Sequence, residues 1–458
     1  MTMRRKNAWT TYNKKQLDEL EKLCKNYLKF LDKGKTEREC VKQIVKQAEE
    51  KGYVNLADIT KDKKALKAGD KVYSVCMDKT VALFQIGKKK LEKGMNILGA
   101  HIDSPRMDVK QNPLYESEEF AYLDTHYYGG IKKYQWVTLP LALHGVVVKK
   151  DGTVITVNVG EDKNDPVFCV TDLLIHLAGE QMEKKANKVI EGENLDVLVG
   201  SKPLEGKEKD AVKEGILEIL KEKYDMTEED FMSAEIEVVP AGHAREAGLD
   251  HSMVMSYGQD DRVCAYTSLA AMLEVEEVEK TTCCLLTDKE EIGSVGATGM
   301  QSRFFENSVA ELMDAMGEFS ELSLRRCLAN SSMLSSDVNA AYDPLFANAF
   351  EKNNASYFGR GVVFSKFTGS RGKSGSNDAN AEYIARIRKM MDKNEVCFQT
   401  AELGKVDVGG GGTIAYILSL YGMEVIDCGV AVLNMHFRSA CTLGNHIQGR
   451  YLRGVQVL

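Results

Sequence analysis

The chain has 458 residues, of which 43% are hydrophobic and 28% charged, a composition that is ordinary for a globular protein with two or three domains. Its net charge of -8 argues against nucleic acid as the main partner, because a protein that binds a duplex needs a basic surface. No apolar run has the length needed to span a bilayer, and no apolar region follows the basic N-terminal segment as it would in a signal peptide. We therefore expect no membrane partner and a cytoplasmic location.

The eleven cysteines are scattered, odd in number and without a CxxC pair. Such a distribution predicts reduced and mostly buried thiols rather than disulfides or a structural zinc site on cysteine.

Residues 14 to 50 are predicted to be helical, because leucine and cysteine recur at spacings of three and four in LDELEKLCKNYLKFLD and the pattern continues until Gly52. Three strand-like segments follow, at residues 71–77, 80–87 and 95–103. The last of them, MNILGAHID, is almost entirely apolar, which is typical of a strand buried on both faces of an α/β sheet.

The sequence pattern changes in the region that begins near residue 107. The segment VVVKKDGTVITVNV predicts a β-hairpin around Asp151 and Gly152. Residues 170–189 and the end of the charged stretch 201–225 have helical spacing.

The α/β alternation resumes after residue 242 and continues to the end of the chain. We therefore predict an α/β fold with a mixed central sheet flanked by helices, interrupted by an inserted, mainly β domain. Residues 1–106 and 243–458 would form the α/β domain, and residues 107–242 the insertion.

Polar side chains follow the buried strands of the α/β domain, where ligands bind in open α/β sheets. The candidates at strand ends are His101, Glu291, Asp337 and His436, and Asp260 joins them from a point where a loop enters a helix. Two imidazoles and three carboxylates are ligands that suit zinc and other first-row divalent ions, and two such ions together polarise a carbonyl and lower the pKa of a shared water. Each residue alone has another explanation; Asp260, for example, could cap a helix.

Two further features involve neighbours of these candidates. Asp103 lies two residues after His101 on an extended segment, so it could accept the second N–H of that imidazole and fix its tautomer, or it could cap a turn. Glu290 and Glu291 would point in opposite directions from an extended strand end. One of the two glutamates could then bind a metal while the other faces water and substrate as a proton shuttle; a solvated turn is the alternative.

Five segments together resemble the aspartyl aminopeptidase family, which includes vacuolar aminopeptidases and many bacterial members: GAHIDSPRMDVK, GQDDRVCAYTSL, DKEEIGSVGATGM, SSDVNAAYDP and NMHFRSACTLGNHIQ. The resemblance covers most of the chain, including the insertion. It implies a zinc-peptidase-like catalytic domain and an aminopeptidase that removes single N-terminal residues from peptides through a metal-activated hydroxide and a glutamate base. Two divalent metal ions are implied, with zinc expected and cobalt or manganese as alternatives.

The resemblance also implies a role for each metal-site candidate. His101 would bind one metal ion and His436 the other, and Asp260 would bridge the two. Glu291 and Asp337 would each complete the coordination of one ion.

For the neighbours of these ligands, the resemblance implies that Glu290 is the general base and that Asp103 orients His101. In related proteins the peptide bond between the residues matching Asp260 and Asp261 is commonly cis.

His176 lies in the predicted helix of the insertion, where a histidine among leucines usually packs in a core. In the family, however, a histidine of the matching segment is implicated in the active site and reaches it from a neighbouring subunit. His176 is therefore a candidate metal or substrate contact. The resemblance further implies self-association as a tetrahedral dodecamer, with the insertion mediating oligomerisation and completing the active site.

The preferred substrate residue is left open by the sequence. The family is named for acidic N-terminal residues, and Lys366, Arg371 and Lys373 are candidate cations for them, but some relatives prefer neutral residues. Two other functions remain as alternatives: an N-acyl amino acid deacylase or carboxypeptidase of the same clan, and a non-catalytic scaffold or binding relative.

Overall fold

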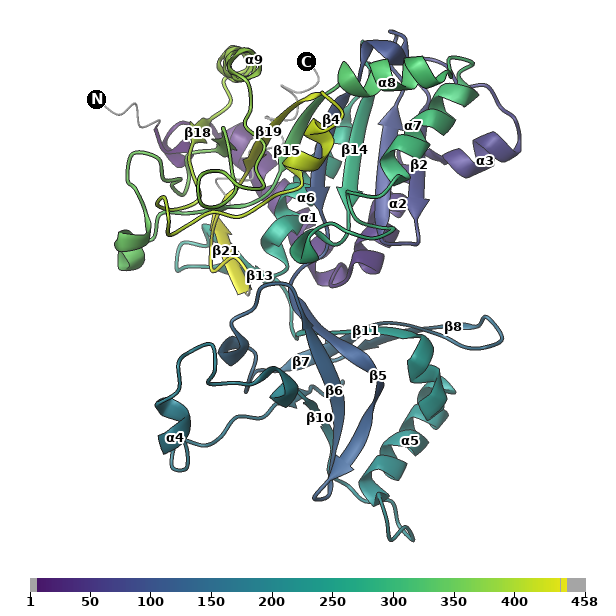
Figure 1. Ribbon diagram of the computed structural model, residues 1–458, viewed down its shortest axis with the longest axis vertical. Coiled ribbons are helices and arrows are strands. Elements are labelled where there is room, and N and C mark those ends of the chain that lie inside the picture. The colour runs from purple at the N-terminus through teal and green to yellow at the C-terminus, as the bar shows by residue number, and fades with distance from the viewer. Residues whose placement is uncertain (1–5, 437, 443–458) are drawn as a thin grey trace. The chain divides into compact units, whose positions relative to one another are not determined.

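The computed structural model describes residues 6–436 and 438–442 (Figure 1). The chain forms two compact units, one made of Met1–Asp103 with Ala244–Leu458 and the other of Ser104–His243. Among the described residues, no helix combines the length and the apolar character that crossing a bilayer requires.

A mixed sheet forms the centre of the larger unit (Figure 1). Within the described residues its strand order is β1-β2-β3-β14-β4-β15-β19-β17-β18. The strands are β1 (Val54–Asn55), β2 (Lys71–Cys76), β3 (Thr80–Gln85), β4 (Asn96–His101), β14 (Thr282–Thr287), β15 (Ser332–Ser336), β17 (Val362–Ser365), β18 (Phe398–Thr400) and β19 (Glu424–Gly429). The neighbours β14, β4, β15 and β19 run parallel, so their carboxyl ends lie along one edge of the sheet.

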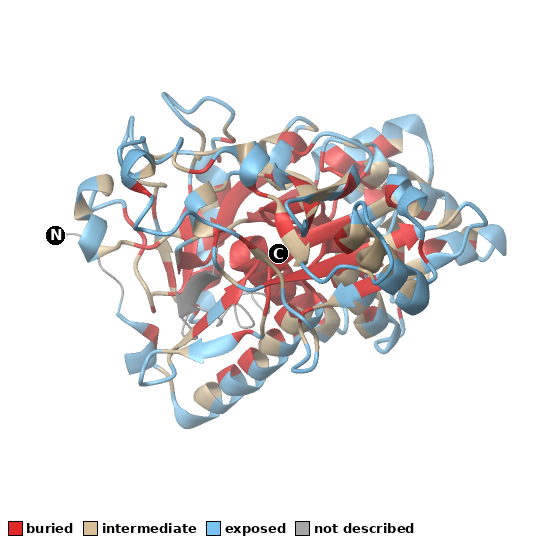
Figure 2. Ribbon diagram, turned by 90° about the horizontal axis from the view of Figure 1, so that it is seen from below, coloured by how far each residue is buried: buried red, intermediate tan, exposed pale blue. Residues whose placement is uncertain are grey.

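Helices cover both faces of this sheet, because successive side chains of each strand point into two different cores. On β14, Cys284 and Leu286 enter one core and Cys283 and Leu285 the other. The first core is closed by α1 (Lys14–Lys33), α2 (Glu37–Glu49) and α6 (Gln259–Glu274). The second is closed by α3 (Leu56–Lys61), α7 (Phe304–Ala315), α8 (Glu321–Ala329) and α10 (Ala415–Ser419), while α9 (Ala381–Lys393) packs on a third cluster. Figure 2 shows the buried residues gathered on the interior strands and the exposed ones on the outer faces of helices and loops. The predicted mixed sheet flanked by helices is confirmed.

The predicted N-terminal helical region consists of the two helices α1 and α2. Each begins with a capping box, in which Asn13 and Gln16 pair at α1 and Thr36 and Glu39 pair at α2. The chain turns between them at Gly34, the residue that follows α1.

A second, smaller sheet belongs to the same unit. Its strand order in the described part of the chain is β12-β13-β21-β20-β16. The strands are β12 (Arg245–Ala247), β13 (Met253–Tyr257), β16 (Asn339–Ala340), β20 (Ala431–Leu433) and β21 (Arg438–Thr442). This sheet fixes the start of α6, which directly follows β13, and the segment after β20.

The unit formed by Ser104–His243 is mainly β, as predicted for the insertion. Its antiparallel sheet has the order β8-β7-β11-β5-β6-β10-β9 in the described residues. The strands are β5 (Arg106–Ser117), β6 (Phe120–Tyr128), β7 (Leu141–Val148), β8 (Val154–Val159), β9 (Cys169–Val170), β10 (Val197–Gly200) and β11 (Ala234–Pro240). The predicted hairpin joins β7 to β8, and the charged stretch ends in the predicted helix, α5 (Ala211–Tyr224).

The helix predicted over residues 170–189 is wrong. Only the single turn α4 (Gly179–Met182) is helical there, and residues 171–178 form loop and turn. Leu174, Ile175 and Leu177 are 55%, 69% and 68% exposed, so their helical spacing meets no core on which a helix could pack.

Ten cysteines have described side chains; these ten are free thiols, and seven of them are buried. Their burial agrees with the prediction that most of the cysteines are packed in the interior.

Candidate metal centre and active site

Three of the predicted site residues lie at the carboxyl edge of the parallel strands. His101 is the last residue of β4, Asp337 directly follows β15, and Glu291 lies shortly after β14. Strand β4 pairs with both β14 and β15, so the three strand ends are immediate neighbours. The sheet order therefore brings these three side chains together.

Asp260 lies in the first turn of α6, where Arg262 fastens the helix to the end of β4. The buried Arg262 guanidinium donates through Nε to the Ile102 carbonyl at 3.2 Å and through Nη2 to the Lys35 carbonyl at 3.0 Å. Gly258 makes room for it, since a Cβ at that position would lie 1.8 Å from Arg262 Nη1 and the backbone φ is 76°. The role of Arg262 was not predicted, although a lone arginine in the apolar stretch RVCAYTSLAAM is an available signal.

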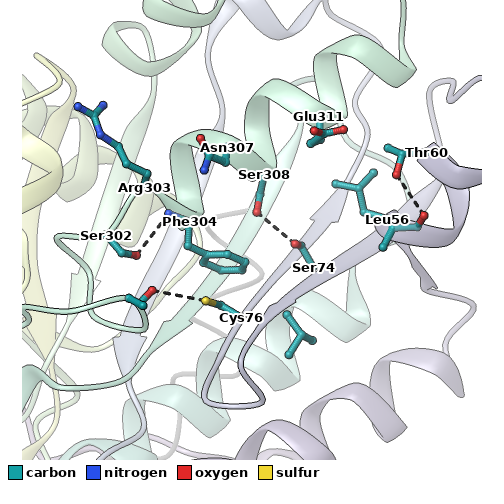
Figure 3. Close-up of a pocket in the computed structure, with 13 residues that line it drawn as sticks. Leu56, Thr60, Ser74, Cys76, Ser302, Arg303, Phe304, Asn307, Ser308 and Glu311 are labelled. Carbon is teal, nitrogen blue, oxygen red and sulfur yellow. Dashed lines mark hydrogen bonds between the residues drawn. The ribbon is translucent and has the colours of Figure 1, made fainter.

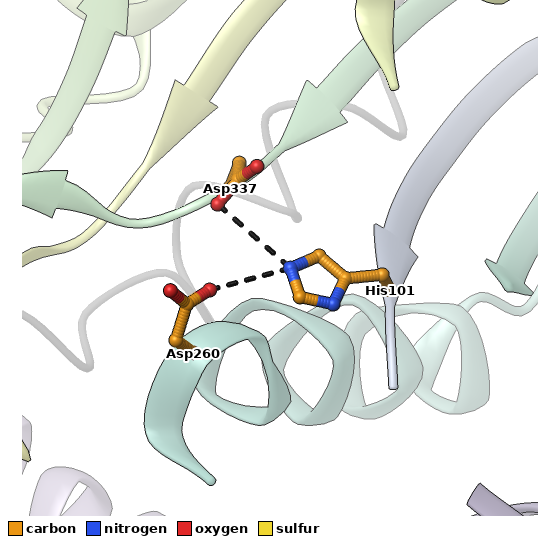
Figure 4. A group of neighbouring side chains, drawn as sticks. All are labelled: His101, Asp260 and Asp337. Atoms are coloured by element: carbon orange, nitrogen blue, oxygen red, sulfur yellow. Dashed lines mark ion pairs between the residues drawn. The ribbon is translucent and has the colours of Figure 1, made fainter. Parts of the chain in front are cut away.

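Figure 4 shows His101, Asp260 and Asp337 facing one another from β4, α6 and the segment after β15. His101 Nε2 lies 3.2 Å from Asp260 Oδ1 and 4.0 Å from Asp337 Oδ1. One ligand atom from each residue lies within 4.8 Å of the others, which is the spacing needed to hold a cation.

A second group shares Asp260. His436, which follows β20, places Nε2 3.1 Å from Asp260 Oδ2 and 3.9 Å from Glu291 Oε1. These three residues again offer ligand atoms within 4.8 Å of one another. The two Asp260 oxygens thus face the two groups separately. The rest of the NMHFRSACTLGNHIQ segment, residues 437–448, lies outside the described side chains. Its backbone is described only for residues 438–442.

The donor set fits divalent cations. His101 Nε2 and Glu291 Oε1 are buried without a hydrogen-bond partner, and an orphaned acceptor of this kind is what a metal ion would satisfy. Burial raises the pKa values of Glu291 and Asp337 well above their usual range, with nearby carboxylates adding to the effect. A cation between the groups would offset this crowding of like charges.

Asp260 differs from these carboxyls. Although burial opposes its ionisation, the imidazoles of His101 and His436 lower the pKa of Asp260 to about 2. It is therefore ionised and placed to bind on both sides.

Asp103 holds three parts of the site at once. It is fully buried, and its carboxylate accepts the backbone N–H of Glu290 at 3.1 Å and of Glu291 at 3.2 Å. His101 Nδ1 lies 3.2 Å from Asp103 Oδ1 and 3.1 Å from the Asp103 carbonyl. Because both of these partners are acceptors, Nδ1 carries a proton, and Nε2 is the ring nitrogen that faces the ligand group. The anchoring of the two glutamates was not predicted, since it joins residues far apart in sequence.

Glu290 lies beside the two groups rather than in them. Its Oε2 is 3.9 Å from His101 Nε2, and its side chain is 16% exposed. Burial raises the pKa of Glu290 to about 7, an effect opposed by His101 and reinforced by Asp103. The prediction that this stretch is extended is wrong: Lys289 has a left-handed φ of 70°, and Glu290–Ile292 forms a 3₁₀ turn that sends the adjacent glutamates in different directions.

The remaining predicted features are located as follows. The peptide bond between Asp260 and Asp261 is cis, as the resemblance implied. Asp261 is fully buried and burial raises its pKa well above the usual range. His176 is exposed in the loop of the smaller unit and belongs to neither ligand group among the described residues.

The sheet, the polar strand ends and the shared aspartate define a metal-dependent hydrolase of the α/β type. The family model described as "Aminopeptidase I zinc metalloprotease (M18)" matches residues 30–451. A Clostridium acetobutylicum protein named "Probable M18 family aminopeptidase 1" is 63% identical over 432 residues, covering 94% of this chain and 93% of that protein. The chain belongs to the M18 family of zinc aminopeptidases.

Solved structures agree with this assignment. The crystal structure of aminopeptidase I from Clostridium acetobutylicum is 58% identical with a TM-score of 0.92, and covers 100% of both chains. The M18 aminopeptidase from Thermotoga maritima is 44% identical with a TM-score of 0.94, and covers 99% of both. A structure of the S. cerevisiae aminopeptidase 1 dodecamer is 20% identical with a TM-score of 0.77, covering 95% of this chain and 96% of that one; this likeness concerns the fold alone.

Proposed function

We propose that this protein removes single N-terminal residues from peptides with the help of two divalent ions. The observation that carries the proposal is the division of the Asp260 carboxylate between two ligand groups, with one oxygen 3.2 Å from His101 Nε2 and the other 3.1 Å from His436 Nε2. A carboxylate that presents one oxygen to each group is the expected bridge of a two-metal site.

The ligands divide between the two ions. His101 and Asp337 would hold one ion together with Asp260, and Glu291 and His436 would hold the other with the same aspartate. When bound, the ions polarise the scissile carbonyl and lower the pKa of the attacking water. Zinc suits these ligands and the family description, and cobalt and manganese are also compatible with imidazole and carboxylate.

Glu290 acts as the general base. Its carboxylate lies next to the ligand groups without belonging to them, and it is partly exposed toward solvent. In this position it accepts a proton from the attacking water and delivers it to the leaving amine. Asp103 supports the step by fixing the backbone of both glutamates and the tautomer of His101.

Self-association through the smaller unit would complete the enzyme. Leu173, Leu174, Ile175 and Leu177 surround His176 and are 46–69% exposed. An apolar run of this kind is typical of a surface that another protein covers. We infer that a second copy of the chain covers it and that His176 thereby reaches the partner's substrate site. The assembly that we propose is a tetrahedral dodecamer; a structure of the distant yeast aminopeptidase is named as a dodecamer. The insertion is then the oligomerisation domain.

The free thiols support a reducing compartment, and we propose the cytoplasm. The substrates are peptides. Among the three candidate cations for an acidic substrate residue, Lys373 is already paired with Asp378 at 3.0 Å. The proposal therefore includes neutral as well as acidic N-terminal residues.

A substrate panel tests the proposed activity. Aminoacyl-p-nitroanilides of acidic and neutral residues are compared with N-acetyl amino acids and with C-terminally free peptides, and zinc content is measured on the same sample. Hydrolysis of the free-amine substrates is expected. Turnover confined to N-acyl substrates would identify a deacylase instead, and no turnover by a zinc-loaded sample would favour a non-catalytic scaffold.

A further inference from the structure

A buried hydrogen-bond network lies next to the catalytic glutamates and involves no proposed metal ligand. Thr298 Oγ1 donates to Asp288 Oδ2 at 2.5 Å. Thr80 Oγ1 donates to the Thr298 carbonyl at 2.5 Å and accepts the backbone N–H of Asp288 at 3.2 Å. The three side chains are at most 3% exposed. Two hydroxyls therefore bind both the side chain and the backbone of one aspartate.

This network joins the two ends of the segment 288–299, which carries the glutamates. The backbone N–H of Asp288 also reaches the Thr298 carbonyl at 3.3 Å, and Asp288 forms a bridge with Gly299. Asp288 is followed by Lys289, whose left-handed backbone turns the chain into Glu290. The position of Glu290 thus depends on a residue only two places away that the threonines hold.

The part of the segment that returns toward Thr298 faces a pocket on one side. Cys76 and Ala297 line a cavity of about 570 Å³ that is bordered by β2 and α7 (Figure 3). Cys76 Sγ donates a hydrogen bond to the Ala297 carbonyl at 3.4 Å. Where a cavity replaces side-chain contacts, hydrogen bonds must define the backbone position.

We propose that Thr80 and Thr298 are positioning residues for the hydrolysis reaction, which hold Asp288 so that Glu290 meets the attacking water. The inference rests on the proposed role of Glu290 as the base. Asp103 fixes the amides of the two glutamates, and the threonine pair fixes Asp288, two residues before Glu290. With the second anchor lost, the backbone before Glu290 can shift; Glu291 belongs to the same turn but would still be held by the ion it binds, and the other proposed ligands lie outside this segment.

Substitutions that remove a single hydroxyl test the proposal in the full-length, zinc-loaded protein. Thr298→Val and Thr80→Val keep the side-chain shape, and Thr298→Ser keeps the hydroxyl. Thr281→Val is the matched control, because Thr281 is equally buried, lies at the opposite end of β14 and accepts the Gly87 N–H at 3.1 Å.

We expect Thr298→Val and Thr80→Val to lower kcat for leucyl-p-nitroanilide by about tenfold or more, because displacement of a catalytic group by less than an ångström has effects of this size. KM and zinc content should stay at the wild-type level. Thr298→Ser should recover most of the lost rate, and Thr281→Val should keep it.

Hydrogen–deuterium exchange provides a readout that does not depend on activity. Amides of residues 288–299 should exchange faster in Thr298→Val than in Thr281→Val. Equal exchange in the two variants, or a kcat no lower than that of Thr281→Val, would overturn the inference. An inactive wild type would instead count against the proposed function, and the exchange comparison would still decide whether the threonines hold the segment.

Discussion

Asparagine at position 103 would disturb the metal centre without changing the shape of the side chain. The Asp103 carboxylate accepts two backbone N–H groups, those of Glu290 and Glu291, and also the Nδ1 proton of His101. In Asp103→Asn one carboxylate oxygen becomes an NH₂ group. One backbone N–H then points at another donor at a position that is fully buried.

The size of the effect follows from these contacts. A buried backbone donor without a partner costs about 1–3 kcal/mol. Loss of the carboxylate that orients a metal-binding histidine lowers metal affinity about 10- to 100-fold, which corresponds to about 1.4–2.7 kcal/mol. The cost of the unpaired donor and the loss of binding free energy are of similar size. We expect the zinc affinity of Asp103→Asn to fall by about one to two orders of magnitude.

A competition titration against a zinc-binding fluorescent chelator measures this affinity. Asp70→Asn is the matched control, because the half-buried Asp70 carboxylate also accepts a backbone N–H, from Lys67 at 2.9 Å, but lies in a turn that carries no proposed ligand. If Asp103→Asn binds zinc as tightly as Asp70→Asn does, the assignment of Asp103 as the orienting residue is refuted.

Glu290→Gln should lower kcat by about 10²- to 10⁴-fold with zinc content unchanged, and full retention of turnover would remove Glu290 as the base. Chelation should abolish activity and lower Tm, because the crowded carboxylates lose their counterion, and added zinc should restore both; activity that survives complete zinc removal contradicts the metal assignment. Leu174→Asp, at a side chain that is 55% exposed, should reduce the assembly mass measured by light scattering without lowering the Tm of the subunit; an unchanged mass places the interface elsewhere. Burial raises the pKa of Asp427 to about 7, so the folded state binds this proton more tightly than the unfolded chain and loses stability as the pH rises from about 4 to about 7. Asp427→Asn should therefore gain up to about 4 kcal/mol relative to wild type between pH 4 and pH 8 in urea unfolding, and a difference that does not vary with pH contradicts this.

Four of the metal-site candidates could be found from the sequence because each follows a strand-like segment, and Asp260 could be found as one of two adjacent aspartates where a loop enters a helix. A parallel sheet gathers the carboxyl ends of its strands, so the ends of β4, β14 and β15 had to lie near one another once these segments were read as strands. The position of Glu290 required more. A left-handed Lys289 and a 3₁₀ turn decide where that carboxylate points, and neither has a strong signal in DKEEIGS.

Contacts between distant segments could not be predicted. Arg262 reaches the carbonyl of Ile102, and Thr80 reaches Thr298, through hydrogen bonds that depend on the finished packing. The helix predicted at residues 170–189 was wrong for a different reason, because here a local pattern was present and the tertiary contacts were not. Its apolar spacing is real, but helical spacing stabilises a helix only when a core is there to receive the apolar face, and the leucines of this segment are exposed in the single chain.

Anomalous scattering at the zinc edge, from a crystal of the zinc-loaded protein, tests most directly whether one aspartate bridges two ions. Two peaks about 4 Å apart are expected on either side of the Asp260 carboxylate, one next to His101 and the other next to His436. A single peak, or a second peak that has no contact with Asp260, would contradict the two-metal site.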